Sequence, residues 1–241
     1  MDNKKQCLII TATVVPNSNF VVNTDSEKRR KEYLDVLKYY SSIFLGDIYF
    51  AENSGFNFLE DIEFSNLFQK ENIYCLSLAP SNEFDKGKGY QEFQVLDEVV
   101  AKINKSYDAF IKVSGRYLTT NFNQLIKQEN QGLIIDRHQV KKVAITAFFR
   151  CRISFYQEHF RSCYKEVNDS KGVFIEHVIY KILKKVDPEK INIFNVTPLY
   201  KGVSGSYGGS LNRHRIKTFL INIERKILKL NGENELKNEF K

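Results

Sequence analysis

The sequence predicts an α/β fold in which a mostly parallel sheet is flanked by helices, with a helical segment at the C-terminus. Two observations support this. Through about residue 125, short apolar runs rich in β-branched residues alternate with amphipathic stretches of helical period, the pattern of a parallel sheet with crossover helices. A basic amphipathic stretch then closes the chain. At 241 residues the chain suits one domain, which we divide into residues 1–125, 126–210 and 211–241.

The elements of the first part follow in order. Cys7–Val15 is expected to be a buried strand, because it is apolar, rich in β-branched residues and followed by Pro16. Ser26–Phe44 carries apolar residues at helical spacing, and Asp25 or Ser26 can cap this helix. The same two patterns predict strand Asp47–Ala51, helix Ile62–Lys70, strand Ile73–Leu78, helix Glu92–Asn104 and strand Ala109–Val113.

The second part is less regular. Its apolar runs predict strands at Leu133–Asp136, Val143–Phe149 and Asn192–Val196. Helical spacing predicts helices at Phe155–Asn168, Phe174–Lys185 and Ile216–Leu230. The polar residues from Asn231 onward are expected to fray.

Composition narrows the class of protein. The chain is 42% hydrophobic and 27% charged, as in an ordinary soluble protein. It has no apolar run long enough to span a membrane and no signal peptide pattern, so we expect a cytoplasmic protein, with peripheral contact on the inner face of the membrane as a further option. The four cysteines form no C-x-x-C pair, which favours reduced thiols over a zinc site.

The formal net charge of +7 favours an anionic partner: nucleic acid, an anionic membrane surface or an anionic small molecule. A nucleic-acid-binding module would display aromatic residues interleaved with Lys and Arg on one face. Most of the 13 Tyr and 19 Phe instead stand at core periodicity. We therefore expect no nucleic acid partner and keep that module as an alternative.

Two motifs point to a phosphate-bearing ligand. The loop Lys86-Gly87-Lys88-Gly89-Tyr90 precedes a helix. Glycine lets a backbone approach a ligand, and a helix N-terminus with lysines attracts phosphate. About twenty residues later, the strand Ala109–Val113 ends in Ser114-Gly115-Arg116, and α/β enzymes place their sites at the carboxyl ends of strands. Lys112, inside that strand, is expected either in solvent or in the site.

The order of these pieces resembles the GT-A glycosyltransferases, which use nucleotide-sugar donors. More narrowly, KGKGYQE at residues 86–92, IKVSGRY at residues 111–117 with Asn121, and FIEH at residues 174–177 are similar to bacterial enzymes of capsule and lipopolysaccharide gene clusters. The resemblance covers roughly residues 5–210. It implies a nucleotide-sugar donor bound by residues 1–125, and a surface glycan or lipid-linked glycan acceptor bound by residues 126–210.

The sequence departs from this family where many members carry an Asp-x-Asp metal motif. Ser114 and Gly115 provide no carboxylate for Mg²⁺ or Mn²⁺. The charge that develops on the departing nucleoside diphosphate must still be stabilised, and the planar guanidinium of Arg116 can pair with two phosphate oxygens. We therefore expect no metal cofactor, with Mn²⁺ or Mg²⁺ bound elsewhere as the alternative. Four further cations are expected to assist: Lys86, Lys88, Lys201 and Arg213.

The resemblance also implies donor-binding residues. The end of the first strand holds the nucleotide in GT-A enzymes, so Thr11 and Thr13 are expected near the base or ribose, with Asn53 after the second strand in a similar role. The simpler interpretation is that these polar groups are satisfied within the protein. Glu92 is expected either to contact the donor sugar or merely to favour the helix dipole.

An inverting transfer needs a base that takes the proton of the acceptor hydroxyl. Glu176 is the first candidate and Asp136 the second; neighbouring His177 is expected to be a satisfied core histidine or a helix-face histidine. The loop Val203–Gly209, between Lys201 and Arg213, is a candidate lid or an inert linker. The basic amphipathic segment that follows is expected to pack on the domain or to lie on an anionic membrane.

A nucleotidyltransferase is the remaining alternative. Such an enzyme would normally carry a glycine-rich Arg/Lys signature directly after the first strand, where this chain has Thr13-Val14-Val15-Pro16-Asn17. The prediction is therefore a glycosyltransferase that moves a sugar from a nucleotide-sugar donor to a hydroxyl of a surface glycan.

Overall fold

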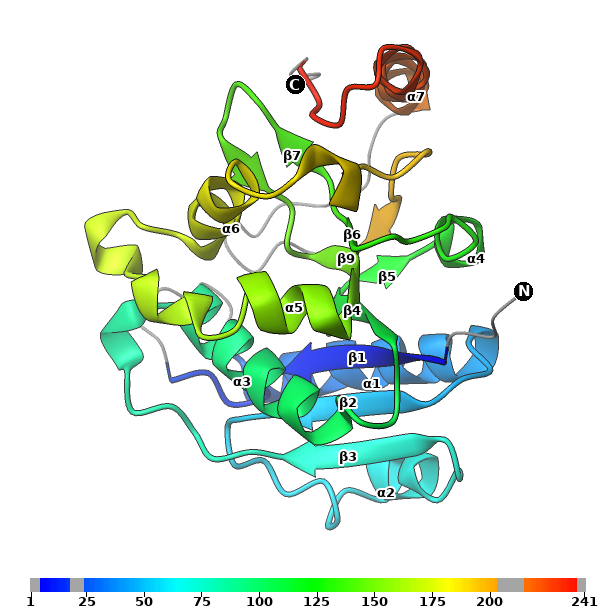
Figure 1. Cartoon of the computed structure of the whole chain (residues 1–241). Coiled ribbons are helices and arrows are strands. Elements are labelled where there is room, and N and C mark those ends of the chain that lie inside the picture. The colour runs from blue at the N-terminus through cyan, green and yellow to red at the C-terminus, as the bar shows by residue number, and fades with distance from the viewer. Residues whose placement is uncertain (1–4, 18–23, 203–214, 238–241) are drawn as a thin grey trace.

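A computed structural model describes residues 5–17, 24–202 and 215–237. Its centre is a seven-stranded sheet with the strand order β10-β6-β9-β4-β1-β2-β3 (Figure 1). The strands are β1 (Gln6–Ala12), β2 (Ile48–Glu52), β3 (Ile73–Ser77), β4 (Ala109–Ser114), β6 (Leu133–Ile134), β9 (Phe148–Arg152) and β10 (Ile191–Asn192). Only β9 runs antiparallel to its neighbours β4 and β6. The predicted α/β fold with a mostly parallel sheet is confirmed.

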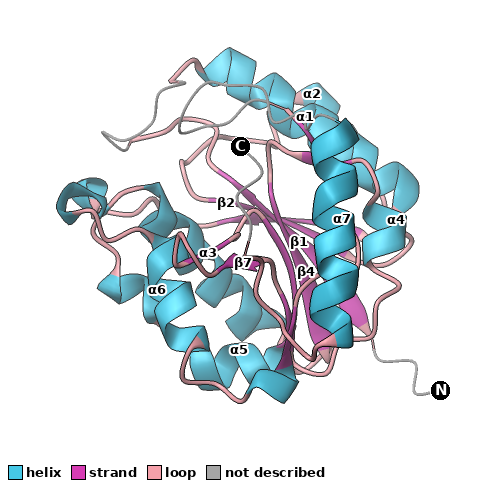
Figure 2. Ribbon diagram, turned by 90° about the horizontal axis from the view of Figure 1, so that it is seen from above, coloured by secondary structure: helices cyan, strands magenta, loops and turns pink. Residues whose placement is uncertain are grey.

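Helices cover both faces of the sheet, as the view from above shows (Figure 2). One face carries α1 (Ser26–Ile43), α2 (Ile62–Phe68) and α4 (Phe122–Leu125). The other carries α3 (Lys88–Ile103), α5 (Ile153–His159) and α6 (Ile175–Leu183). Two short pairs lie outside the main sheet: β5 (Leu118–Thr119) with β11 (Tyr200–Lys201), and β7 (Arg137–His138) with β8 (Val143–Ala144).

The alternation of side chains along the central strands decides which groups reach the site. In β1, Leu8 and Ile10 face α1, whereas Cys7 and Ile9 face α3. Because strand side chains alternate with a period of two, Thr11 also faces α3. The same rule in β4 places Lys112 and Ser114 on the α3 side. Polar side chains from two adjacent strands therefore meet under one helix.

The C-terminal helix α7 (Arg215–Leu230) lies at one end of the molecule (Figure 1). A buried ion pair anchors it, because Nη1 and Nη2 of Arg225 donate to the two carboxylate oxygens of Asp136 at 2.7 and 2.5 Å. A small apolar cluster supports this contact; it consists of Ile193, Ile221, Leu228 and Leu236. The predicted packing of this helix on the domain is confirmed.

Five sequence predictions need correction. The strand expected at residues 192–196 is β10, which ends at Asn192. Helix α3 begins at Lys88 rather than at Glu92, so most of the glycine-rich loop is helical. The expected strand at residues 143–149 is divided into β8 and β9. The helix expected at residues 155–168 stops at His159, where a 3₁₀ turn follows. Residues 232–237 do not simply fray, because Leu236 is buried and pairs with His138 as an isolated bridge.

Candidate functional site

A cavity of about 220 Å³ opens at the carboxyl ends of β1 and β4, between α1, α3 and the start of α6. Eight predicted site residues line it: Thr11, Thr13, Lys88, Glu92, Ser114, Gly115, Arg116 and Glu176. Further lining residues that carry polar side chains are Arg29, Tyr33, Gln91, Tyr117 and Thr146. The fold thus collects residues from distant parts of the sequence at the edge of the sheet where α/β proteins bind ligands.

A buried polar network forms the floor of this cavity. Nζ of Lys112 donates to Oε1 of Glu92 at 2.7 Å, to Oγ of Ser114 at 2.9 Å and to the carbonyl of Thr146 at 2.8 Å. These three bonds use all three ammonium hydrogens. The side chain of Lys112 is fully buried, so the solvent-exposed interpretation of this lysine is wrong.

Glu92 is the centre of the network. Its Oε1 also accepts hydrogen bonds from the hydroxyls of Thr11 at 2.7 Å and Ser114 at 2.9 Å. Burial by itself would raise the pKa of Glu92, but the Lys112 ammonium and these donors outweigh it and lower the pKa. The side chain remains about one-quarter exposed and lines the cavity, where its second oxygen can accept a hydrogen bond from a ligand.

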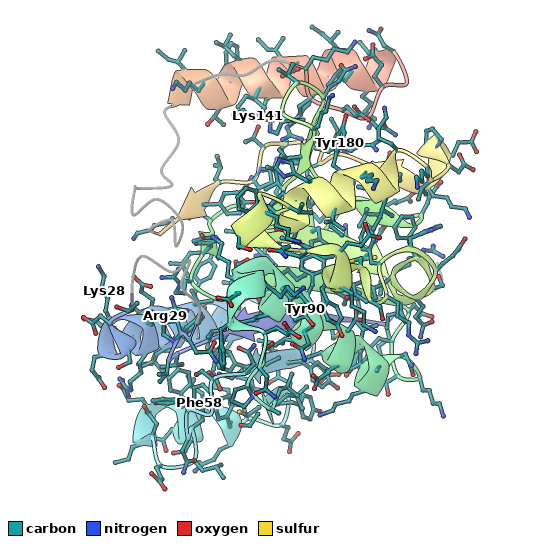
Figure 3. All side chains as sticks on the ribbon, turned by 90° about the vertical axis from the view of Figure 1, so that its left-hand side faces the viewer. Lys28, Arg29, Phe58, Tyr90, Lys141 and Tyr180 are labelled. Carbon is teal, nitrogen blue, oxygen red and sulfur yellow. The ribbon has the colours of Figure 1, made fainter. Side chains whose placement is uncertain are left out.

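Helix α1 contributes a cation beside the end of β1. Arg29 is buried and donates from Nε to the carbonyl of Thr13 at 2.9 Å and from Nη2 to the hydroxyl of Tyr33 at 3.1 Å. The Tyr33 hydroxyl in turn accepts a hydrogen bond from the backbone N–H of Thr13 at 3.0 Å. Arg29 and Tyr33 therefore hold the end of β1 in place. Figure 3 labels Arg29 on this helix.

Arg116 lines the cavity opposite α3. Its Nη1 donates to Oε2 of Glu32 at 3.0 Å. This is an ion pair at the end of a strand, as expected of a structural arginine, and the same side chain also lines the cavity. Its neighbour Gly115 is packed too closely for any side chain. A Cβ at this position would lie 2.5 Å from the carbonyl oxygen of Thr11 and 2.8 Å from the Tyr33 ring.

The glycine-rich motif has a structural explanation. Gly87 has a φ of +93°, and a Cβ there would lie 1.9 Å from Oδ2 of Asp169. At Gly89 a Cβ would lie 2.6 Å from Ile175. Asp169 accepts a hydrogen bond from the backbone N–H of Lys88. Both glycines therefore make room for residues of this chain, Asp169 and Ile175. The sequence predicts phosphate beside the first turn of α3, and the structure has the Asp169 carboxylate there.

Carboxylates also lie on the α6 side. Glu176 stands in the first turn of α6, lines the cavity and accepts a hydrogen bond from the Thr146 hydroxyl at 3.3 Å. Burial and the nearby charge of Glu176 raise the pKa of Asp169 to about 6. A half-buried carboxylate that faces the cavity has the position needed for a general base.

The other predicted site residues lie elsewhere. Asn53 accepts a hydrogen bond from the Thr13 hydroxyl at 2.7 Å and supports the cavity wall from behind. Lys86 and the exposed Lys201 do not line the cavity. Arg213 and the candidate lid at residues 203–209 lie outside the described residues. Asp136, the second candidate base, is bound to Arg225 and does not line the cavity.

The cavity does not fit the divalent metal that the resemblance associates with this fold. The end of β4 carries Ser114, Gly115 and Arg116 in place of paired carboxylates. Within the described ranges no three His, Cys, Asp or Glu residues are grouped as metal ligands. Oε1 of Glu92 is already paired with the Lys112 ammonium, and that cation disfavours a second positive charge beside it.

The sequence matches no protein-family model and no curated protein. Among solved structures, it is similar to a nucleotide-diphospho-sugar transferase from Desulfovibrio desulfuricans (9% identity, TM-score 0.48, 75% of this chain and 76% of that one). It is also similar to the bifunctional glycosyltransferase WbbM (8% identity, TM-score 0.50, 80% of this chain and 39% of that one). A third similar structure is 4-diphosphocytidyl-2C-methyl-D-erythritol synthase from Anaerococcus prevotii (11% identity, TM-score 0.47, 92% and 96%). At these identities the similarity concerns the fold, and the chain has the GT-A-like sheet that the sequence predicts.

Sequence reasoning missed Arg29, Tyr33 and Asp169, and it left Lys112 open between solvent and the site. A signal for Lys112 was present, because a lysine inside the apolar run Phe110–Val113 must either be paired or break the strand. The sequence indicates Arg29 and Tyr33 as a pair only weakly. They stand four residues apart on one helix face, but they lie within a densely charged stretch where such spacings are common. Asp169 lies in a short turn, and nothing in the sequence distinguishes it from other turn aspartates.

Proposed function

We propose that this protein is a glycosyltransferase that moves a sugar from a nucleotide-sugar donor to a hydroxyl of a surface glycan acceptor, of the capsule or lipopolysaccharide kind. The observation that carries the proposal is the cavity at the carboxyl ends of β1 and β4. There cationic groups for a diphosphate (Arg29 and Arg116) and carboxylates for hydroxyl groups (Glu92 and Glu176) line the same cavity.

In the proposed reaction, Glu176 and Arg116 have separate roles. The acceptor oxygen forms a bond to the anomeric carbon, and the bond from that carbon to the diphosphate breaks. Glu176 takes the proton of the acceptor hydroxyl. Arg116 offsets the negative charge that remains on the nucleoside diphosphate. Thr11 and Thr13 lie at the end of β1, where the base or ribose is proposed to bind.

Glu92 is proposed to orient the donor sugar. Its Oε1 is occupied by Lys112, Thr11 and Ser114, so its position is fixed before a ligand arrives. Its lowered pKa keeps it ionised at neutral pH. A fixed carboxylate repels phosphate but accepts hydrogen bonds from hydroxyls, so the sugar rather than the diphosphate belongs on this side of the cavity.

We propose a metal-independent reaction, because the residues at the end of β4 do not match a divalent metal and cations surround the cavity. The test is a thermal-shift panel of UDP, GDP, ADP and CMP on the full chain, each with EDTA and with Mn²⁺. A ligand that binds only the native state raises the melting temperature. One nucleotide is expected to stabilise the wild type in EDTA and to stabilise Arg116→Ala much less.

The control variant is Lys201→Ala, which removes a cation outside the cavity and is expected to keep the full shift. Stabilisation that requires Mn²⁺ would overturn metal independence and the role of Arg116. Release of pyrophosphate when the chain is given nucleoside triphosphates in a separate assay would indicate a nucleotidyltransferase instead. If no nucleotide stabilises the chain, the glycosyltransferase proposal fails.

A further inference from the structure

Helix α7 presents apolar side chains to solvent. Its sequence is amphipathic, but the polar residues Glu224 and Arg225 face the protein while most large apolar residues face outward. The outward residues form a stripe along the whole helix: Ile216 (64% exposed), Phe219 (65%), Leu220 (39%), Ile223 (40%), Ile227 (52%) and Leu230 (86%). We call these six residues the α7 stripe. Contiguous exposed apolar surface of this kind marks an interaction site.

The orientation of the helix is fixed rather than accidental. Besides the bidentate pair with Asp136, Arg225 donates to the carbonyl of Phe194 at 2.7 Å. Asn222 accepts hydrogen bonds from the backbone N–H and the hydroxyl of Thr197 at 2.8 and 2.7 Å. Turning α7 to bury its stripe would leave the charge of Arg225 without its buried partner, which is costly. The fold therefore holds the stripe outward.

The charged side chains that α7 itself exposes are positive. Lys226 and Lys229 are exposed on α7, whereas its one carboxylate, Glu224, is buried. The tip of the β7–β8 hairpin lies at the same end of the molecule, as Figure 3 shows by the position of Lys141 relative to α7. That tip also exposes one apolar residue beside two lysines: Val140, Lys141 and Lys142.

We propose that α7 and the β7–β8 tip bind the surface of an anionic lipid bilayer. An apolar stripe bordered by lysines on a helix that lies in the interface is the arrangement that inserts shallowly among lipid headgroups. Exposed lysines complement the negative surface of anionic lipids. A second copy of this chain fits less well, because a symmetric pair joins two patches of the same net positive charge.

No membrane-spanning helix takes part, since no helix among the described residues is both long and apolar enough to cross a bilayer. The contact is therefore peripheral. It would hold the protein at a surface that carries lipid-linked molecules, but it does not depend on the proposed function, because binding to a bilayer requires neither donor nor acceptor. The two proposals can fail separately.

The test is flotation of the full chain with vesicles of phosphatidylcholine alone and of phosphatidylcholine mixed with phosphatidylglycerol. The wild type is expected to float with the anionic vesicles, less with the neutral ones, and less at high salt. The double variant Lys226→Glu/Lys229→Glu is expected to bind on the order of fivefold more weakly for each lysine removed. Ile223→Ser/Ile227→Ser is expected to lose most binding.

Matched controls make the same chemical changes elsewhere. Leu59→Ser/Ile62→Ser alters residues that are 82% and 76% exposed, and Lys102→Glu/Lys105→Glu alters exposed lysines at the end of α3; both are expected to float like the wild type. Wild type that floats with neither vesicle overturns the proposal. So does a concentration-dependent dimer in light scattering that Ile223→Ser/Ile227→Ser abolishes, since it would assign the stripe to a second copy.

Discussion

Nζ of Lys112 lies 2.7 Å from Oε1 of Glu92, and this ion pair joins β4 to α3 directly under the cavity. The lysine is fully buried, while the carboxylate keeps one side open to the cavity. Burial lowers the pKa of Lys112, and the charge of Glu92 opposes that effect. A buried cation beneath the cavity thus fixes the position and charge of a carboxylate that faces the cavity.

Removing the lysine is expected to destabilise the fold strongly. Lys112→Met leaves Glu92 without its cation, and breaking one side of a buried pair costs about 3–5 kcal/mol. The double variant Lys112→Met/Glu92→Gln is expected to recover much of this loss, because no unpaired charge remains. Urea unfolding of the three proteins measures the difference. Equal stability of the single variant and the wild type would show that the pair does not hold β4 to α3.

The raised pKa of Asp169 predicts a dependence of stability on pH. The folded-state value of about 6, against an ordinary value of 3.8, means that the native state binds this proton more tightly than the unfolded state. The associated stability is complete below pH 4 and is lost as the pH rises through 6. The loss is on the order of 3 kcal/mol, since one pKa unit is worth about 1.4 kcal/mol.

Asp169→Asn is the variant that isolates this effect, because its amide oxygen can still accept the Lys88 N–H. Its stability is expected to exceed that of the wild type increasingly between pH 4 and pH 7. Urea unfolding at several pH values measures the gap. Parallel stability curves for the two proteins would contradict the prediction.

The sequence predicted the main sheet well because its signals are local. Buried parallel strands are continuous apolar runs, and the crossover helices have clear periodicity, so β1 to β4 and α1 to α3 were found with small errors at their ends. The second part was predicted less well. Its strands have two to five residues, and residues 143–149 form one apolar run whose division into β8 and β9 is decided by long-range pairing.

In the candidate site, too, residues within local sequence motifs were predicted better than those placed by long-range contacts. Arg116 and Glu176 follow sequence motifs, and the structure brings both to the cavity. Lys86 and Gly87 looked equally suited to phosphate, yet Gly87 is shaped around Asp169, which lies 82 residues later in the chain. No local pattern can reveal which distant residue will fill the space that a glycine leaves.

Adding a methyl group at Gly87 tests that explanation. Gly87→Ala combines an unfavourable φ with a clash against the Asp169 carboxylate, so the free energy of unfolding is expected to fall by about 2–4 kcal/mol. Gly172→Ala is the matched control, because Gly172 has a φ of +71° but nothing within 4 Å of a Cβ; it is expected to lose about 1–2 kcal/mol. Chemical unfolding of both variants compares them. Equal losses would mean that the contact with Asp169 adds nothing to the backbone strain.

Of the two candidate bases, Glu176 is expected to affect activity and Asp136 to affect stability. Glu176→Gln keeps the shape of a half-exposed side chain, so its stability is expected to change by less than about 1 kcal/mol. Its turnover of the donor identified by thermal shift is expected to fall on the order of a hundredfold to ten-thousandfold. His177→Gln alters the exposed neighbour on the same helix and is expected to keep wild-type turnover.

Asp136→Asn is expected to behave in the opposite way. It leaves Arg225, which is only 2% exposed, without its carboxylate partner, and the free energy of unfolding is expected to fall by about 3–5 kcal/mol. Because the ion pair lies under α7 and away from the cavity, turnover per folded molecule is expected to match the wild type at a temperature where the variant is folded. Parallel measurements of turnover and unfolding on both variants check this. If Asp136→Asn lost turnover while folded and Glu176→Gln kept it, the base would have to be sought on the α7 side of the sheet, because the acceptor would then approach from Asp136.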